Sequence, residues 1–490
     1  MLRVMRLPTL LRARLPLLIA AYCSELAYLG FFLRQFPLLH WYRRDVDMGN
    51  ITGHSHWGMV GFVVATIELF TLFGIAWWLS RDLDDRATLW IVLGAGAVFL
   101  GTMVYVYPVT AIDIYAYIQQ SWILVHYHQN PIFVAPQSYP HDPLMAYARG
   151  WQSFGSPYGP LGIIIDAIPV AVTRGDLLGS LILLKAMFSL MALGTAYVVY
   201  EILRVVRPRY AVSGALLVAW NPLVVIEVGS NGHNDIAMMF LTSLAVLAMV
   251  RRHYAAGPLL LLAAVLVKYT VILLIPLFLV YGFVRHPDLR AKVVYLASTV
   301  AWMYALAAVA YFPFWNGIDT ITRLTGQSHR YVDSFSTLFT SLIPIGISLD
   351  QAAFLGWVLF VPFYNYALMQ STGEIVTLLR SSFLVLFAFL ALGTSNVEGW
   401  YALWPVVLGA AVPRLTERLA AALLSFGATI SAILYGYIWV WMGLRDPHAF
   451  TVVNNLSYLV TFLPASLVLA GITLWKKPLA VRAEREPTRV

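Results

Sequence analysis

The stretch "ATLWIVLGAGAVFLGTMVYVYPVTAIDIYAYIQQ", residues 87–120, joins a long apolar run to a polar and aromatic segment. No charged residue occurs between Ala87 and Tyr107, and about 20 apolar residues are the length of a helix that crosses a bilayer. Asp113 follows a few residues later, among tyrosines and glutamines. The stretch therefore predicts a membrane-spanning helix that ends at a polar segment.

Apolar runs recur throughout the chain. Of 490 residues, 60% are hydrophobic and 11% are charged, whereas soluble domains have roughly 25% charged residues. The sequence therefore predicts an all-α polytopic membrane protein with about 12 to 14 transmembrane helices, including one short re-entrant hairpin. The clear spans are 15–33, 57–79, 87–107, 177–203, 211–228, 236–250, 293–312, 351–369, 375–392, 400–412, 419–442 and 456–475.

The basic residues indicate the orientation. The net charge is +8, but Lys and Arg lie mostly in short loops between apolar runs and in the tail 476–489. This is the distribution of cytoplasmic loops, so it does not indicate a nucleic-acid partner. It predicts a multi-pass protein of the cytoplasmic (plasma) membrane with both termini in the cytoplasm and Asp113 on the extracytoplasmic side. The run 15–33 is too long for a signal-peptide core and is expected to be retained.

Two segments do not fit a simple alternation of spans. Residues 253–284, between basic pairs that should both be cytoplasmic, number 32, which is too few for two crossings of about 20 residues and a turn. They predict a short re-entrant hairpin with Lys268 and Tyr269 near its tip, and Lys268 directed into a wet cavity. On the other side, the outer loop 107–176 is long, and its apolar part 158–176 predicts juxtamembrane helices.

Asp113 and its neighbours form the first polar group predicted on the outer face, together with Tyr117. A carboxylate at the membrane surface can accept a proton from a hydroxyl nucleophile as a general base. The alternative is an aspartate that caps the helix or lies in its first turn, favoured by the helix dipole.

A second group is the turn "EVGSNGHND", Glu227 to Asp235, in which His233, Asn234 and Asp235 offer donors and acceptors to the same outer space. Helix capping explains part of this pattern. Zinc ligation by these residues with the histidines of "HYH" is not favoured, because histidines at i and i+2 diverge on a helix. The single Cys23 excludes an intramolecular disulfide and a cysteine metal cluster.

Lys268 and an aromatic segment complete the set. A lysine inside a membrane protein pairs with a phosphate or with a buried carboxylate such as Glu227. The segment "VEGWYALWPVV", 397–407, places Trp400 and Tyr401 at the start of a helix, where they could be an interfacial aromatic belt or a platform for a sugar ring.

Motifs for cytosolic nucleotide donors are absent from the sequence. There is no P-loop, GxGxxG, G-x-S-x-G or kinase motif. An enzyme with this sequence would use a donor that arrives within the membrane, and lipid-linked sugars fit that description.

At this point the motifs "DIYAYIQQ", "NPIF", "SPYGP", "WNPLVVIEVGSNGHNDIAMM", "AAVLVKYTVILLIPL" and "GWYALWPVVLGAA" can be compared with a known family. In order and approximate spacing they resemble the actinobacterial α(1→6)-mannosyltransferases of lipomannan synthesis, in the GT-C superfamily. The resemblance implies a GT-C fold in three parts. Residues 1–86 would form two additional transmembrane helices, 87–413 the catalytic membrane core, and 414–490 the C-terminal helices and a basic cytoplasmic tail.

The resemblance also implies a reaction. The donor would be a polyprenyl-phosphate mannose and the acceptor a membrane glycolipid or glycan, with inversion and with Asp113 as the base. Lys268, aided by Arg323 or Arg330, would hold the phosphate, and no cofactor or metal is chemically required. The other residues that the comparison assigns to the substrates are Tyr117, Asn130, Tyr158, His233, Asn234, Asp235, Trp400 and Tyr401.

Three positions depart from the family pattern. Ile132 replaces a tyrosine, Asp235 stands where some relatives have Glu, and Gly399 replaces a proline. The rival functions are a GT-C transferase for arabinofuranose or glucose, and a transporter or flippase of a lipid-linked saccharide. Glu25, Glu68 and Lys185 lie inside predicted helices and are expected to pair with one another.

Overall fold

The structure is a computed structural model that describes residues 9–147, 149–325, 330–343 and 345–475. Within these residues the chain is helical and has no strand, which confirms the predicted all-α polytopic class. Nine of the described helices are long and apolar enough to cross a membrane, or ten if one bent pair counts as a span. They are α1 (Thr9–Ala27) with η1 (Tyr28–Leu33), α4 (His56–Ser80), α5 (Arg86–Val104), α8 (Leu177–Val206), α14 (Leu289–Tyr311), α17 (Leu349–Gln370), α18 (Ile375–Ala388), α20 (Leu415–Ile430) with its continuation to Met442, and α22 (Pro447–Trp475).

This number is smaller than the predicted 12 to 14 because several predicted spans are short or broken. The spans predicted at 236–250 and 400–412 form α11 (Asp235–Val250) and α19 (Leu403–Ala411). The span predicted at 211–228 is bent by 40°. The bend lies at Pro222, which has no N–H to continue α9 (Ala211–Ala219), and the side chain of Asn221 caps the next turn.

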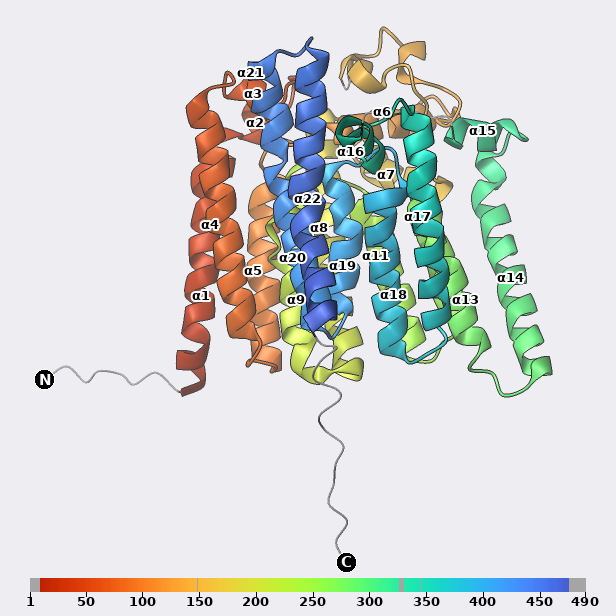
Figure 1. Ribbon diagram of the computed structural model, residues 1–490. Helices are drawn as coiled ribbons and strands as arrows, with labels where there is room; N and C mark the ends of the chain where they lie inside the picture. Colours follow the sequence, from red (N-terminus) through yellow and green to blue (C-terminus); the bar gives the residue numbers. More distant parts are fainter. Residues whose placement is uncertain (1–8, 148, 326–329, 344, 476–490) are drawn as a thin grey trace, which may run out of the picture.

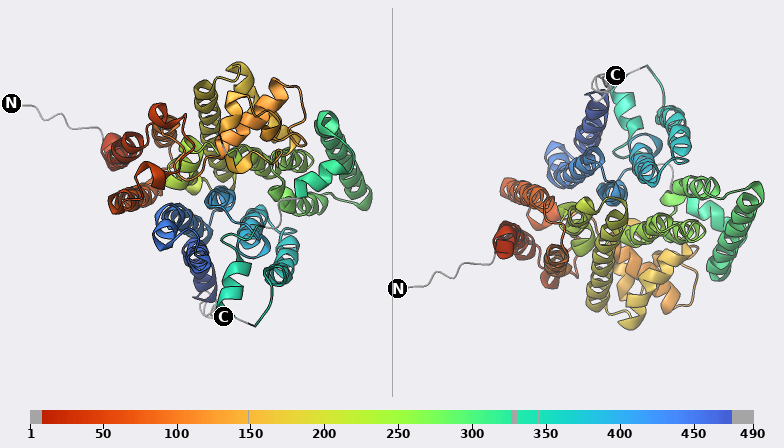
Figure 2. Two further views of the ribbon diagram at one scale, coloured as in Figure 1. Left: turned by 90° about the horizontal axis from the view of Figure 1, so that it is seen from above. Right: turned by 90° about the horizontal axis from the view of Figure 1, so that it is seen from below.

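The long helices stand side by side, and the outer loops gather at one end of the bundle (Figure 1). That end carries α6 (Asp113–Val125), α15 (Asp319–Thr325) and α16 (Phe335–Leu342), whereas α1 begins and α22 ends at the opposite end. In the middle, α8, α9, α11 and α19 pack against one another. Figure 2 shows α14 at the margin of the bundle, and most of its surface is exposed.

The segment 253–284 forms the short hairpin that the residue count predicts. It consists of α12 (Ala256–Val265), the 3-10 turn η7 (Tyr269–Leu274) and α13 (Ile275–Phe283). The helix breaks between α12 and η7, where Lys268 is extended, with φ −150° and ψ 130°. Lys268 therefore lies at the break.

A junction of two helix ends satisfies the backbone at this break. The N–H of Gly159 donates to the carbonyl of Val267 (3.1 Å), and the N–H of Leu161 donates to that of Leu266 (2.9 Å). The first N–H groups of α7 (Pro160–Val172) and the last carbonyls of α12 would otherwise lack helical partners. Each helix end therefore caps the other.

The three ionisable residues inside predicted helices do not pair with one another, so that expectation was wrong. Lys185 is fully buried and donates to the carbonyl of Val106 at the end of α5 (2.6 Å). Glu25 accepts a hydrogen bond from Thr102 (2.5 Å). Glu68 lies on the exposed face of α4. Lys185 and Glu25 each bond to a residue in α5 or directly after it, and not to each other.

The junction generates a stability prediction. A Cβ on Gly159 would lie 2.2 Å from the carbonyl oxygen of Leu266, so Gly159→Ala should force the two helix ends apart. We expect overpacking of this kind to cost about 1–3 kcal/mol and to lower the melting temperature of the detergent-solubilised protein. Gly74→Ala on α4 is the control, because nothing lies within 4 Å of its added methyl. Equal melting temperatures for the two variants would contradict the junction.

Candidate active site

Asp113 lines a cavity at the end of the bundle that carries the outer loops. It is the first residue of α6, but no side-chain hydrogen bond caps this helix. Its Oδ1 instead accepts a hydrogen bond from Trp151 Nε1 (3.0 Å). We call the space the Asp113 cavity; it measures about 170 Å³ and is lined by Asp113, Trp151, Pro157, Tyr158, Lys268, Arg330, Asn396, Glu398, Trp400 and Tyr401.

Two cations face this cavity from different parts of the chain. Lys268 comes from the hairpin break and Arg330 from the loop between α15 and α16. The Arg330 guanidinium lies 5.4 Å from the centre of the Trp151 ring, so the same indole contacts both the carboxylate and the cation. Arg323, predicted as a possible helper, lines a different cavity next to Ile132.

The residues that follow Arg330 are held by backbone and side-chain bonds. Val332 pairs with the segment before α19, donating to the Ser395 carbonyl (3.0 Å) and accepting from the N–H of Val397 (2.9 Å). Asp333 accepts hydrogen bonds from Tyr435 and from Ser457 of α22 (2.5 Å to Ser457). These bonds fix the chain directly after Arg330.

Lys268 forms an ion pair inside the protein. Its Nζ lies 2.8 and 2.9 Å from the two carboxylate oxygens of Asp235, and Trp404 Nε1 donates to the same carboxylate (2.5 Å). The rings of Tyr158 and Tyr401 flank the ammonium, with centres at 5.8 and 4.7 Å. One carboxylate and three aromatic side chains thus hold the Lys268 ammonium in place.

Glu227, which the sequence suggested as the partner of Lys268, pairs with His233 instead. Its Oε2 lies 2.9 Å from His233 Nδ1 and accepts from Asn231 (2.6 Å), while Oε1 accepts from Thr110 (2.9 Å). Asp235 begins α11, which packs against α12 of the hairpin, whereas Glu227 precedes the turn and faces the loop before α6. Helix packing therefore decides which carboxylate Lys268 meets.

The rest of the predicted turn forms a layer behind the cavity. His233 is fully buried and stacks on Trp400, with ring centres 4.2 Å apart. Asn234 Nδ2 donates to Asp166 Oδ2 (3.0 Å), and Asn231 Oδ1 accepts from the N–H of Val109 (2.7 Å). None of these three is among the residues that line the Asp113 cavity.

Of the remaining predicted residues, three line the Asp113 cavity and two do not. Tyr117 is buried with its ring edge-to-face on Tyr158 at 5.3 Å, and within the described residues its hydroxyl has no hydrogen-bond partner. Asn130 uses its side chain inside the outer loop, donating to the Phe314 carbonyl (2.9 Å) and accepting from the N–H of Ile132 (3.0 Å). Tyr158, Trp400 and Tyr401 line the cavity directly.

The cavity changes the acidity of its carboxyl groups. Burial raises the pKa of Asp113, while His233, the Trp151 hydrogen bond and Lys268 act in the opposite direction. Burial and the negative charges of Asp113 and Asp333 raise the pKa of Glu398 to about 8. Asp113 is thus a stronger base than an exposed aspartate and stands next to a carboxyl group that is mostly protonated at pH 7.

Trp151 and Glu398 are site residues that the sequence did not single out. Trp151 lies in the long outer loop without a recognisable motif around it. Glu398 precedes the aromatic pair in "VEGWYALWPVV", and an acidic residue beside aromatic residues at the end of an apolar run was the available signal.

Comparisons with known proteins identify the family of the chain. Residues 35–284 match the family model described as "Alpha-(1->6)-mannopyranosyltransferase, N-terminal domain". The chain is 25% identical over 398 residues to alpha-(1->6)-mannopyranosyltransferase A of Mycobacterium tuberculosis, covering 74% of each chain. It is 24% identical over 275 residues to the protein of that name from Corynebacterium glutamicum, covering 52% of this chain and 53% of the relative.

The class of protein is therefore a membrane glycosyltransferase that transfers mannose. The chain belongs to the alpha-(1->6)-mannopyranosyltransferase family.

The buried ion pair generates a second stability prediction. Asp235 is fully buried and Lys268 is 15% exposed, so Asp235→Asn should leave the ammonium without its counter-ion and destabilise the protein by about 3 kcal/mol. We expect the double variant Asp235→Asn/Lys268→Met to recover part of this loss, because no unpaired charge remains. Thermal melts of the single and double variants in detergent form the cycle, and strictly additive changes would show that the two groups do not interact.

Proposed function

We propose that the protein transfers a mannosyl residue from a polyprenyl-phosphate donor to a glycolipid or polysaccharide acceptor at the extracytoplasmic face, with inversion. The observation that carries the proposal is the Asp113 cavity, in which one carboxylate of raised basicity faces two cations, Lys268 and Arg330. A base and a pair of phosphate ligands are what an inverting transfer from a sugar phosphate requires.

The reaction is a single displacement. Asp113 takes the proton of an acceptor hydroxyl as its oxygen forms a bond to the anomeric carbon. The bond from that carbon to the phosphate oxygen breaks on the opposite side, and its electron pair leaves with the phosphate. Lys268 and Arg330 stabilise the charge on the departing phosphate. One displacement inverts the anomeric centre.

The nature of the cations favours a phosphate-bearing donor. Arg330 offers a planar fork of donors that suits phosphate oxygens, and Lys268 adds a compact positive charge. Asp235 neutralises part of the Lys268 charge when no ligand is bound. A donor held by a lipid tail would reach this cavity from within the helix bundle. The sequence has no nucleotide-binding motif, which favours a lipid-linked donor.

The distribution of basic residues supports the extracytoplasmic side. The loops at the end opposite the cavity carry Arg81, Arg251, Arg285 and Arg414. Loops rich in Arg and Lys remain in the cytoplasm. The cavity would then open on the other side, with both chain termini in the cytoplasm.

Removal of the proposed base tests the mechanism. We expect Asp113→Asn to lower turnover by at least about 100-fold, because a general base contributes about 10²–10⁴-fold, and to leave donor binding largely intact. The assay incubates purified protein with radiolabelled polyprenyl-phosphate mannose and a glycolipid extract and follows the label by thin-layer chromatography. Asp319→Asn is the matched control, since Asp319 also begins a helix at this end but is exposed.

Three outcomes separate the alternatives. Unchanged turnover in Asp113→Asn would remove the base assignment. Transfer from a lipid-phosphate arabinofuranose or glucose but not from mannose would replace the donor sugar. A wild-type protein that binds the lipid and leaves the sugar–phosphate bond intact would favour a transporter of lipid-linked saccharides.

The hydrogen bond from Trp151 generates a pH prediction. It stabilises the charged form of Asp113 and so lowers the pKa that burial raises. Trp151→Phe removes this donor and keeps an aromatic ring under Arg330, so the pKa of Asp113 should rise further. Because the base must be deprotonated, the acidic limb of the profile of kcat/KM against pH should move to higher pH, with a similar plateau above it. A limb that stays in place or moves to lower pH would contradict the assigned role.

A further inference from the structure

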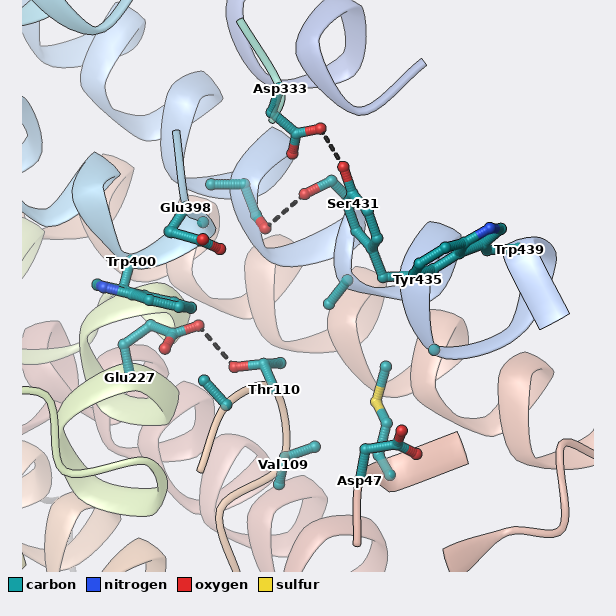
Figure 3. Close-up of a pocket in the computed structure, with 16 residues that line it drawn as sticks. Asp47, Val109, Thr110, Glu227, Asp333, Glu398, Trp400, Ser431, Tyr435 and Trp439 are labelled. Carbon is teal, nitrogen blue, oxygen red and sulfur yellow. Dashed lines mark hydrogen bonds between the residues drawn. The ribbon is translucent and has the colours of Figure 1, made fainter. Parts of the chain in front are cut away.

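A second cavity lies beside the Asp113 cavity and is not used by the proposed mechanism. It measures about 300 Å³ and lies between the loop before α6, the segment from α20 to α21 (Trp439–Met442) and residues 398–400 (Figure 3). Asp47, at the start of α3 (Met48–Ile51), closes one side of it, and Asp333 and Tyr435 close another. All of its lining residues belong to the described part of the chain.

The lining of this second cavity is acidic. Four carboxylates face it, and no Lys, Arg or His is among its lining residues. Such a lining offers no cation to a phosphate, and its carboxyl oxygens can form hydrogen bonds with hydroxyl groups. Aromatic rings, including Trp400 and Trp439, add apolar faces. The combination fits an uncharged polyol with apolar ring faces, which is the chemistry of a hexose.

Of the four acidic residues, Glu227 and Asp333 have protein partners on both carboxyl oxygens, whereas Asp47 and Glu398 do not. Glu227 is bonded to Thr110, Asn231 and His233. Asp47 uses Oδ1 to cap the N–H of Asn50 (2.7 Å), and within the described residues no hydrogen bond is made by its other oxygen. Glu398 has only a long contact of 3.4 Å, from Asn396. Acceptor atoms therefore remain available to a ligand at both ends of the cavity.

The second cavity adjoins the site of the reaction. Glu398 and Trp400 line both cavities, and the segment 109–111 that lines the second cavity leads directly into Asp113. The cations, however, lie only on the Asp113 side. The two spaces thus differ in charge and share one wall.

We infer that the second cavity is a binding subsite for the acceptor glycan and holds an uncharged hexose unit of the acceptor next to the unit whose hydroxyl reaches Asp113. This inference rests on the proposed function, because it takes the Asp113 cavity to be the place of transfer. The phosphate-bearing donor occupies the cationic cavity and the acceptor chain the acidic one.

The test fills the cavity and measures acceptor binding without any donor. The probe is a soluble α(1→6)-linked manno-oligosaccharide, and its binding to the purified full-length chain in detergent is followed by saturation-transfer NMR. Ala432 lines the second cavity, and Ala432→Phe places a ring in it. Ala301→Phe is the matched control, because Ala301 lies on the exposed face of α14 at the margin of the bundle.

We expect Ala432→Phe to weaken oligosaccharide binding at least tenfold, while its binding of the polyprenyl-phosphate donor and all binding by Ala301→Phe remain unchanged. Asp47→Asn is a second variant, and it does not fill the cavity. It should fold normally, because asparagine also caps a helix. Loss of the charged acceptor should weaken oligosaccharide binding about tenfold.

The outcomes distinguish this inference from the proposed function. Wild-type affinity for the oligosaccharide in both Ala432→Phe and Asp47→Asn, or no binding by the wild type, would overturn the subsite. Loss of donor binding in Ala432→Phe would also overturn it, since the donor would then occupy the second cavity. Oligosaccharide binding that depends on Ala432 and Asp47 but is followed by no transfer would support the subsite and refute the proposed reaction.

Discussion

The end-to-end junction between α7 and α12 is the constraint on which the rest of the site depends. A helix that breaks inside a membrane protein leaves carbonyl groups without partners, and each such group costs several kcal/mol where water is excluded. The carbonyls of Leu266 and Val267 are satisfied by the first N–H groups of α7. Because a Cβ on Gly159 would lie 2.2 Å from the carbonyl oxygen of Leu266, the outer loop and the hairpin meet in this register through a backbone contact that requires glycine.

The register has a direct chemical consequence. Tyr158 precedes the junction on one side and Lys268 follows it on the other, so the tyrosine ring and the ammonium become neighbours. Asp235 then serves as the counter-ion that makes a lysine tolerable in this place. A pair of this kind keeps the ammonium in position, and under the proposed function the ammonium also donates to the phosphate of the donor.

The sequence predicts those features that depend on length, hydropathy and charge. Apolar runs and basic loops predict the helical class, and counting residues between Arg252 and Arg285 predicts the hairpin. The partner of Lys268 is beyond such reasoning, because Glu227 and Asp235 lie within the same turn and only the packing of α11 on α12 selects between them. Trp151 is 38 positions from Asp113 in the sequence, beyond the end of α6, and no local pattern encodes their contact. The predicted number of membrane spans is too high for a similar reason, because hydropathy does not show that the helix bends at Pro222.

Under the proposed assignment, the shared wall lets one site bind a charged donor and an uncharged acceptor in separate cavities. Trp400 separates the spaces and is itself held from behind by His233, whose ring stacks on it. The cations Lys268 and Arg330 lie on one side of this wall and Asp47 on the other, while Glu398 is part of the wall itself. Under the proposed assignment, an acceptor that passes the wall reaches Asp113 from the acidic side while the phosphate is held on the cationic side. Attack and departure then take place on opposite faces of the anomeric carbon, which is the alignment that inversion requires.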